Sequence, residues 1–307
     1  MKTALVFPGQ ASQQVGMGKD LYENYDIAKE MFEIAEKILE FDLAKICFDG
    51  PKTALTETKI TQPALFVVSS IITRILKEKS FEFDAVAGHS LGEYSAMYSA
   101  GVFSFEDGLK LVKERGNSMQ LAGEKNPGTM AAIIKLDKEK ILEACDKASE
   151  YGLVKIANIN SENQIAISGE KDAVQSAMKY AKKLGAKIVV ELEVSGAFHS
   201  PLMSYATEIL TSTINSVSFK KPKISIYANV DAKSCHSIPK LKENLINQIE
   251  SPVLWLDTIN NMINDGFGKF IEVGPGKVLR GLIKRIDKNV ELEGVSNSED
   301  IKRITNE

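Results

Sequence analysis

The chain has 307 residues, 44% of them hydrophobic and 26% charged, which is typical of a globular protein with room for one large domain and an insert. Its formal net charge of -3 gives no sign of binding to nucleic acid or to an anionic membrane. No segment reads as a signal peptide or a membrane span, and the three cysteines form no CxxC pair, so we expect a cytoplasmic protein without disulfides or a metal site.

The first third of the chain alternates buried strands with helices. Residues 3–9 (TALVFPG) predict a strand that stops at Pro8, and residues 84–90 predict a second strand. Apolar residues at helical spacing predict helices at 25–39, 60–78, 91–101 and 105–122. For the helix at 60–78 we expect Thr61 or Gln62 as the N-cap and Pro63 in the first turn.

A smaller unit is predicted after Asn126-Pro127-Gly128. Its segments read in the order strand 129–136, helix 138–152, strands 154–160 and 164–169, helix 171–185 and strand 186–194. This βαββαβ order is that of a ferredoxin-like subdomain. We therefore expect a small ferredoxin-like subdomain at residues 126–195, inserted into a large one formed by residues 1–125 and 196–307.

The larger pattern resumes after the insert. Residues 223–230 predict a strand, residues 269–277 predict a strand and then a turn, and residues 241–249, 253–266 and 278–286 predict helices. Strands and helices that alternate on both sides of an insert indicate an α/β fold with a mostly parallel sheet.

A G-x-S-x-G pattern lies between the second strand and the helix that follows it. In a nucleophile elbow, Gly88 and Gly92 allow the tight turn, Ser90 stands at the start of a helix, and the N–H of Leu91 faces a developing oxyanion. The alternative is a turn rich in glycine and serine that has no chemistry. The flanking strand and helix favour the nucleophile.

A serine nucleophile needs a base, and the chain has three histidines. His89 adjoins Ser90 in a tight turn, so its side chain should point away, and His236 lies in a polar loop. His199 follows the last strand of the insert, at a domain junction where it can face a cleft. His199 is therefore the candidate base. No aspartate stands out as its partner, and His199 comes early for a hydrolase of the Ser-acid-His order.

Six motifs, in this order and over nearly the whole chain, resemble the malonyl-CoA:acyl carrier protein transacylases of fatty-acid synthesis. They are FPGQASQ, ITQPALF, GHSLGEYSA, KERGNSMQ, GAFHSPLM and EVGPGKVL. Acyltransferase domains of polyketide and large fatty-acid synthases share them more distantly. The resemblance implies a hydrolase-like α/β core that carries a ferredoxin-like subdomain.

The resemblance also implies a role for each matching residue. Ser90 would carry the acyl group and His199 would move its proton. The backbone N–H groups of Gln10 and Leu91 would form the oxyanion hole. The remaining assignments are Arg115 and Gln62 around the malonyl carboxylate, the backbone carbonyl of Gln248 in NQIESPVLW as the group that orients the histidine, and Phe198 as the residue that selects malonyl over branched acyl groups.

These roles imply a ping-pong transfer from malonyl-CoA to the phosphopantetheine thiol of acyl carrier protein, with no metal or bound cofactor. The carrier is acidic in this family, so a transient complex with basic residues is expected, with Lys182 and Lys183, or Lys220, Lys221 and Lys223, as candidates. The family implies a monomer. Two alternatives stay open: a serine thioesterase or other hydrolase that uses water, and a non-catalytic carrier-binding module.

Overall fold

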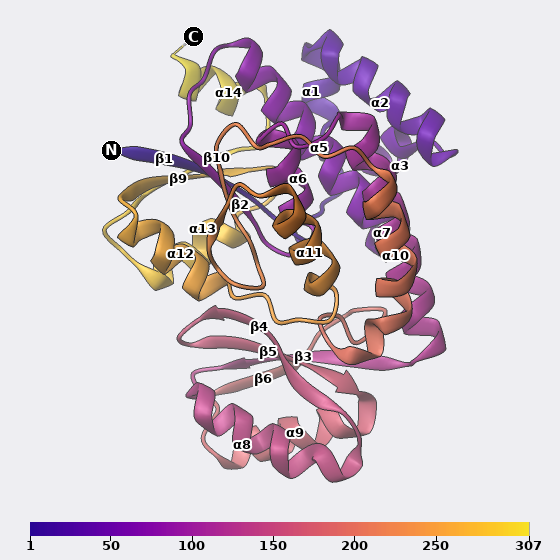
Figure 1. Cartoon of the computed structure of the whole chain (residues 1–307), viewed down its shortest axis with the longest axis vertical. Coiled ribbons are helices and arrows are strands. Elements are labelled where there is room, and N and C mark those ends of the chain that lie inside the picture. Colours follow the sequence, from indigo (N-terminus) through magenta and orange to yellow (C-terminus); the bar gives the residue numbers. More distant parts are fainter. Residues whose placement is uncertain (307) are drawn as a thin grey trace.

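Two separate β-sheets organise the chain in the computed structural model, which describes residues 1–306. Figure 1 shows a large lobe, which contains both ends of the chain, above a small lobe. We use "small lobe" for residues 128–191 and "large lobe" for the rest. The chain enters and leaves the small lobe once.

Sheet A, in the large lobe, has the strand order β10-β9-β1-β2-β7-β8. All neighbouring strands are parallel except the β7–β8 pair. The strands are β1 (Lys2–Phe7), β2 (Ala85–Gly88), β7 (Ser225–Tyr227), β8 (Ser234–Cys235), β9 (Phe267–Val273) and β10 (Glu291–Val295). Because β1 and β2 run in parallel with Phe7 opposite Gly88, the segments that follow these two strands lie side by side. The mostly parallel sheet that the sequence predicts is confirmed.

Helices cover both faces of sheet A. Alternate residues of β1 face opposite sides, with Leu5 and Phe7 in the main core and Ala4 and Val6 in a second core. The main core is shared with α2 (Asp26–Leu39), α5 (Thr58–Glu78), α6 (Gly92–Ser99), α7 (Phe105–Lys125), α10 (Ser204–Ser216), α11 (Ile238–Gln248) and α14 (Ser298–Thr305). The second core is shared with α12 (Trp255–Asn264) and α13 (Val278–Ile286). Short helices α1 (Lys19–Asn24), α3 (Leu43–Asp49) and α4 (Lys52–Thr56) lie between β1 and α5.

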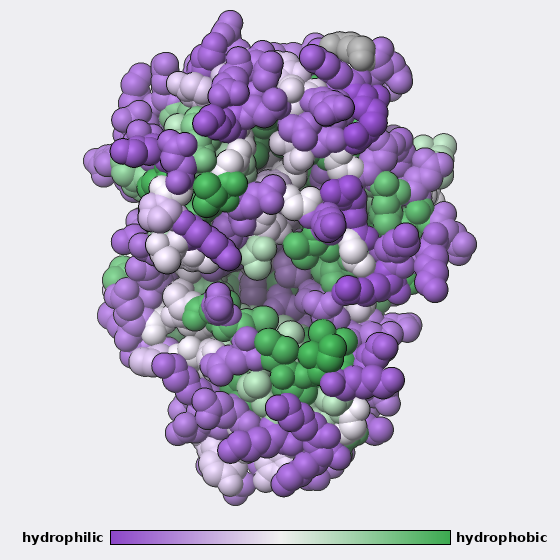
Figure 2. Space-filling view, turned by 180° about the vertical axis from the view of Figure 1, so that it is seen from behind, coloured by the Kyte–Doolittle hydropathy of each residue, from purple (hydrophilic) through white to green (hydrophobic). Residues whose placement is uncertain are grey.

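Sheet B, in the small lobe, is antiparallel with the order β4-β5-β3-β6. Its elements follow the chain as β3 (Gly128–Ile134), α8 (Lys138–Ala148), β4 (Val154–Ser161), β5 (Gln164–Glu170), α9 (Lys171–Lys183) and β6 (Ile188–Glu191). The lobe has a core of its own, to which α8, α9 and alternate strand residues contribute. Seen from behind, the surface is mostly hydrophilic, with an apolar patch on the small lobe near the junction (Figure 2).

Helix α5 corrects one expectation. It begins at Thr58, so Thr61 and Gln62 lie inside the helix and neither is the N-cap, and Pro63 is the sixth helical residue. The first turn closes on the carbonyl of Glu57, which accepts from the amides of Ile60 and Thr61. The Glu57 side chain makes no capping bond, so no residue pattern marks this start. By length and composition α5 could cross a membrane, but 89% of its most apolar window is buried inside the protein.

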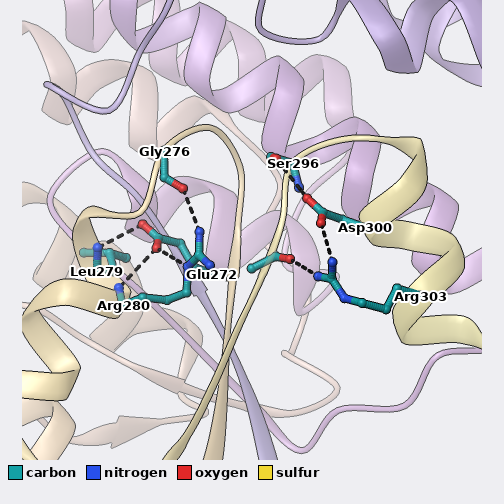
Figure 3. Close-up of polar contacts among 8 residues, drawn as sticks. Glu272, Gly276, Leu279, Arg280, Ser296, Asp300 and Arg303 are labelled. Carbon is teal, nitrogen blue, oxygen red and sulfur yellow. Dashed lines mark hydrogen bonds and ion pairs between the residues drawn. The ribbon is translucent and has the colours of Figure 1, made fainter.

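The turn EVGPGK, between β9 and α13, is built on a buried carboxylate. Glu272 is fully buried, and its oxygens accept from the amides of Leu279 at 2.9 Å and Arg280 at 3.1 Å, as Figure 3 shows. The Arg280 side chain returns to the same carboxylate at 3.2 Å and donates to the carbonyl of Gly276 at 3.1 Å. A negative charge at a helix N-terminus is also stabilised by the positive end of the helix dipole. Glu272 therefore fixes both the turn and the start of α13.

We predict that Glu272→Ala lowers the free energy of unfolding by about 3 kcal/mol, because two helix amides and Arg280 lose a buried acceptor. Urea unfolding followed by circular dichroism measures the change. Glu143→Ala is the matched control, since Glu143 pairs with Lys147 on an exposed helix face, and it should cost less than about 0.5 kcal/mol. Equal losses in the two variants would contradict the role given to Glu272.

Candidate active site

Ser90 stands in a strained turn at the carboxyl end of β2. Its φ of 52° is left-handed, a conformation that a residue other than glycine adopts only when the surroundings enforce it. The turn is so tight that a Cβ on Gly88 would lie 1.9 Å from the carbonyl carbon of Gly92, and one on Gly92 would lie 2.0 Å from the Phe7 oxygen. Both glycines are therefore sterically required, as the elbow pattern predicts.

Asn229, which lies in none of the six motifs, holds this turn in place. Its Oδ1 accepts from the Ser90 amide at 2.7 Å, and its Nδ2 donates to the Gly88 carbonyl at 2.6 Å. Asn229 follows β7, the strand next to β2, and is fully buried. Its position could have marked it as a site residue, because ligand sites lie at the carboxyl ends of the strands in a parallel sheet.

His199, the candidate base, is hydrogen-bonded to Ser90. Its Nε2 lies 2.8 Å from Ser90 Oγ, and its Nδ1 lies 2.8 Å from the backbone oxygen of Gln248. A carbonyl can only accept, so Nδ1 carries the hydrogen and the neutral ring presents Nε2 as an acceptor to the serine hydroxyl. Burial lowers the pKa of His199 to about 3, and the positive charge of Arg115 acts in the same direction. The ring is therefore neutral at ordinary pH.

Arg115 extends from α7 toward the same serine and is only 1% exposed. It donates to Gln62 Oε1 at 2.8 Å, to Gln248 Oε1 at 2.9 Å and to Ser90 Oγ at 3.1 Å. All three acceptors are neutral. A buried guanidinium is costly without an anion, so this arrangement suits a ligand with a carboxylate placed beside Ser90.

The other predicted residues lie around this centre. Leu91 is the buried N-cap of α6. The segment after β1, which contains Gln10, packs closely against the serine turn, since a Cβ on Gly9 would lie 2.5 Å from the His89 oxygen. Gln10 Nε2 donates to Thr58 Oγ1 at 3.3 Å. Phe198 precedes His199 in the chain and is 6% exposed, within the main core.

The two remaining histidines have other partners. His89 Nε2 lies 2.8 Å from Asn160 Oδ1 of β4, and its ring stands edge-on to Trp255. Burial lowers the pKa of His89. His236 is exposed and its Nε2 lies 3.0 Å from Ser225 Oγ. Neither ring is hydrogen-bonded to Ser90 in the described part of the chain, which leaves His199 as the histidine at the serine.

The candidate docking lysines lie on two segments outside the serine turn, α9 and the loop between α10 and β7 that contains Lys220, Lys221 and Lys223. Lys220 and Lys223 are anchored through their amides to the carbonyls of Val102 and Ala100, beyond the end of α6 that is opposite the elbow. Lys182 and Lys183 are in the last turn of α9, on the helical side of the small lobe. Within residues 1–306, no group of three or more His, Cys, Asp or Glu side chains is placed to hold a metal ion.

Comparisons with known proteins give one consistent result. The acyl transferase domain model matches residues 4–303. The malonyl CoA-acyl carrier protein transacylase of Bacillus subtilis is 42% identical over 301 residues, which cover 98% of this chain and 95% of that protein. An acyl carrier protein S-malonyltransferase from Vibrio cholerae has a TM-score of 0.95 at 42% identity and covers 99% of this chain and 100% of its own. A malonyl-transacylase solved in complex with a type II PKS acyl carrier protein has a TM-score of 0.96 at 37% identity, with both chains fully covered. The chain therefore belongs to the acyl transferase domain family, among the malonyl-CoA:acyl carrier protein transacylases.

Proposed function

We propose that this protein is an acyl carrier protein S-malonyltransferase, which moves the malonyl group of malonyl-CoA to the phosphopantetheine thiol of acyl carrier protein, to supply chain elongation in fatty-acid or polyketide synthesis. The observation that carries the proposal is a buried arginine, Arg115, that donates to the oxygen of a serine already hydrogen-bonded to a neutral histidine. A planar guanidinium can hold the free carboxylate of a malonyl group while its thioester carbon lies at Ser90.

In the first half-reaction, Ser90 Oγ attacks the thioester carbonyl carbon while His199 Nε2 takes the hydroxyl proton. The backbone N–H groups of Gln10 and Leu91 stabilise the tetrahedral oxyanion. When this intermediate collapses, the C–S bond breaks, the malonyl ester forms on Ser90, and His199 returns the proton to the CoA thiolate. The carbonyl of Gln248 holds His199 in the required tautomer throughout.

The second half-reaction runs the same steps with the carrier thiol as nucleophile. Its sulfur attacks the malonyl ester while His199 takes the thiol proton, the C–O bond breaks, and the proton goes back to Ser90 Oγ. Both half-reactions exchange an acyl group between a thioester and the same serine, so one set of residues serves both. Neither half-reaction requires a metal or a bound cofactor.

Selection for malonyl rests on two further residues. Gln62 accepts from Arg115 NH1, which orients the guanidinium toward Ser90. Phe198, in the core next to His199, limits the space beside the acyl chain and disfavours a branched group such as methylmalonyl. An acetyl group has no carboxylate to pair with Arg115, so acetyl-CoA should be the poorer substrate.

We also infer the architecture and setting that go with this function. Residues 1–125 and 196–307 form a hydrolase-like subdomain, and residues 126–195 form a ferredoxin-like insert, which the antiparallel order β4-β5-β3-β6 supports. The protein acts in the cytoplasm as a monomer, with an acidic acyl carrier protein as a transient partner. The related transacylase solved with its carrier supports that partner.

A burst experiment tests the function. Mixing the enzyme with malonyl-CoA alone should release about one CoA per chain and stop, because the acyl group waits on Ser90 for a thiol. Mass spectrometry should place the malonyl group on the peptide that contains Ser90, and adding holo-carrier protein should restart CoA release. Steady release of CoA without carrier would favour a thioesterase, and the absence of any adduct would overturn the proposal.

A further inference from the structure

Glu93 has a buried carboxyl group near Ser90, and the proposed reaction does not use this group. It is the second residue of α6 and is fully buried. Its Oε2 accepts from Gln248 Nε2 at 2.6 Å and from the Asn229 amide at 3.3 Å, while its Oε1 has no hydrogen-bond partner among residues 1–306. An ionised carboxylate with one oxygen unsatisfied is costly in the protein interior, so a nearby positive charge is needed to offset it.

The side chain of Gln248 connects Glu93 to Arg115. Its Oε1 accepts from Arg115 NH2 at 2.9 Å, and its Nε2 donates to Glu93 Oε2 at 2.6 Å. The amide therefore points its negative end at the cation and its positive end at the carboxyl group. The direct acceptors of Arg115 are all neutral, and the nearby groups that favour its charged form are Tyr94 and Glu93. Burial keeps the Tyr94 phenol neutral, so Glu93 is the one of the two that can supply a negative charge. In the free enzyme, ionised Glu93 supplies the negative charge that offsets the Arg115 guanidinium. We assign the same part to the malonyl carboxylate when substrate is bound.

Four titratable groups act on Glu93 or lie beside it. Arg115 favours its ionised form, and Asp231, which follows β7, opposes it. The Tyr94 phenol and the Cys235 thiol of β8 stay neutral, since burial raises the pKa of each. Burial raises the pKa of Glu93 to about 7, although Gln248 and Asn229 donate to it, so both protonation states are populated at neutral pH.

We propose that Glu93 is a proton-linked positioning residue: its carboxylate balances Arg115 in the free enzyme, and it becomes more protonated, by uptake from solvent, when the malonyl carboxylate binds Arg115. This inference rests on the proposed function. Two carboxylates that share one guanidinium cannot both keep full stabilisation, so the second one raises the pKa of the first. The proton bonds to a Glu93 oxygen, no other bond changes, and the uptake offsets part of the negative charge that the malonyl carboxylate adds to the buried site.

The consequence is a pH-dependent preference for malonyl. Above about pH 7, ionised Glu93 predominates and competes with the malonyl carboxylate for Arg115, so malonyl binding weakens as pH rises. Below it, Glu93 is protonated and Arg115 is free for the substrate. Since the pKa of His199 is about 3, its titration lies outside this window.

The test is the ratio of kcat/KM for malonyl-CoA to kcat/KM for acetyl-CoA, measured between about pH 5.5 and about pH 9 in the wild type and in Glu93→Gln. The ratio cancels titration of the CoA moiety, which both substrates share. In the wild type it should fall about tenfold as pH rises, which corresponds to about one pKa unit of coupling. In Glu93→Gln it should be flat, and Asp231→Asn should keep the fall.

A second measurement needs no variant. Malonylation of the wild type at about pH 7 in weak buffer should take up about 0.4 proton per chain, read with an indicator dye, and acetylation should take up none. A pH-independent ratio, or the absence of uptake, in an enzyme that forms malonyl-Ser90 would overturn this inference and leave the proposed function intact. Failure to form malonyl-Ser90 at all would remove both.

Discussion

Replacing His199 with alanine should lower kcat for malonyl transfer by about 10⁴-fold, the largest effect we expect at a residue other than the nucleophile. The reason is the short contact between Nε2 and Ser90 Oγ, 2.8 Å, with the ring fixed in the required tautomer by the Gln248 carbonyl. A hydroxyl without a base is a weak nucleophile at neutral pH. The burst of CoA on mixing with malonyl-CoA measures acylation directly, and it should become slower by the same factor.

His236→Ala is the matched control for this prediction. His236 is exposed, contacts Ser225, and has no contact with the serine turn, so its loss should leave the burst rate within about twofold of the wild type. His89→Ala also removes structural contacts, because His89 packs against Trp255 in the large lobe and is hydrogen-bonded to Asn160 in the small lobe. If His89→Ala abolished acylation while His199→Ala did not, the assignment of the base would be wrong.

The part of the site that could be predicted from sequence is the part that local rules describe. A G-x-S-x-G between a strand and a helix requires small residues at 88 and 92, and the structure shows why, in contacts shorter than any side chain allows. The partners of Ser90 are far away in sequence, at positions 115, 199 and 248, and only the family resemblance indicated most of them. Asn229 lies in none of the six motifs, and Glu93 lies within GHSLGEYSA, where the resemblance gives it no role. They contact the site residues because the ends of β2, β7 and α11 lie together in the fold, which brings Asn229 to Ser90 and Glu93 to Gln248.

The fold shows the same division. Strongly periodic segments such as α2 and α9 lie where their apolar spacing predicts. Helix α10 was missed, since its many Ser and Thr residues favour caps and turns over helix interiors. It forms because Ala206, Leu210 and Ile214 pack into the main core, and hydroxyls such as that of Thr211 bond back to carbonyls one turn earlier. Edge strand β10 was also missed, because its mixed residues gain their strand conformation from pairing with β9.

Arg115→Ala should reverse the substrate preference of the enzyme. We expect kcat/KM for malonyl-CoA to fall by about 10³-fold, because the malonyl carboxylate would be buried beside Ser90 without its cation and next to the carboxyl group of Glu93. Acetyl-CoA has no carboxylate to desolvate, so its kcat/KM should fall far less, and acetyl should become the better substrate. Parallel measurement of both substrates over a range of concentrations gives the two values.

Arg115→Lys separates charge from geometry in this prediction. A lysine keeps the positive charge but offers a single ammonium where the guanidinium reaches Gln62, Gln248 and Ser90 together. If two-point recognition matters, Arg115→Lys should recover only part of the malonyl activity, to about 10-fold to 100-fold below the wild type. Full recovery would reduce the role of Arg115 to that of a point charge. An unchanged malonyl-to-acetyl ratio in Arg115→Ala would show instead that selectivity arises elsewhere, with the packing of Phe198 against the acyl chain as the remaining source.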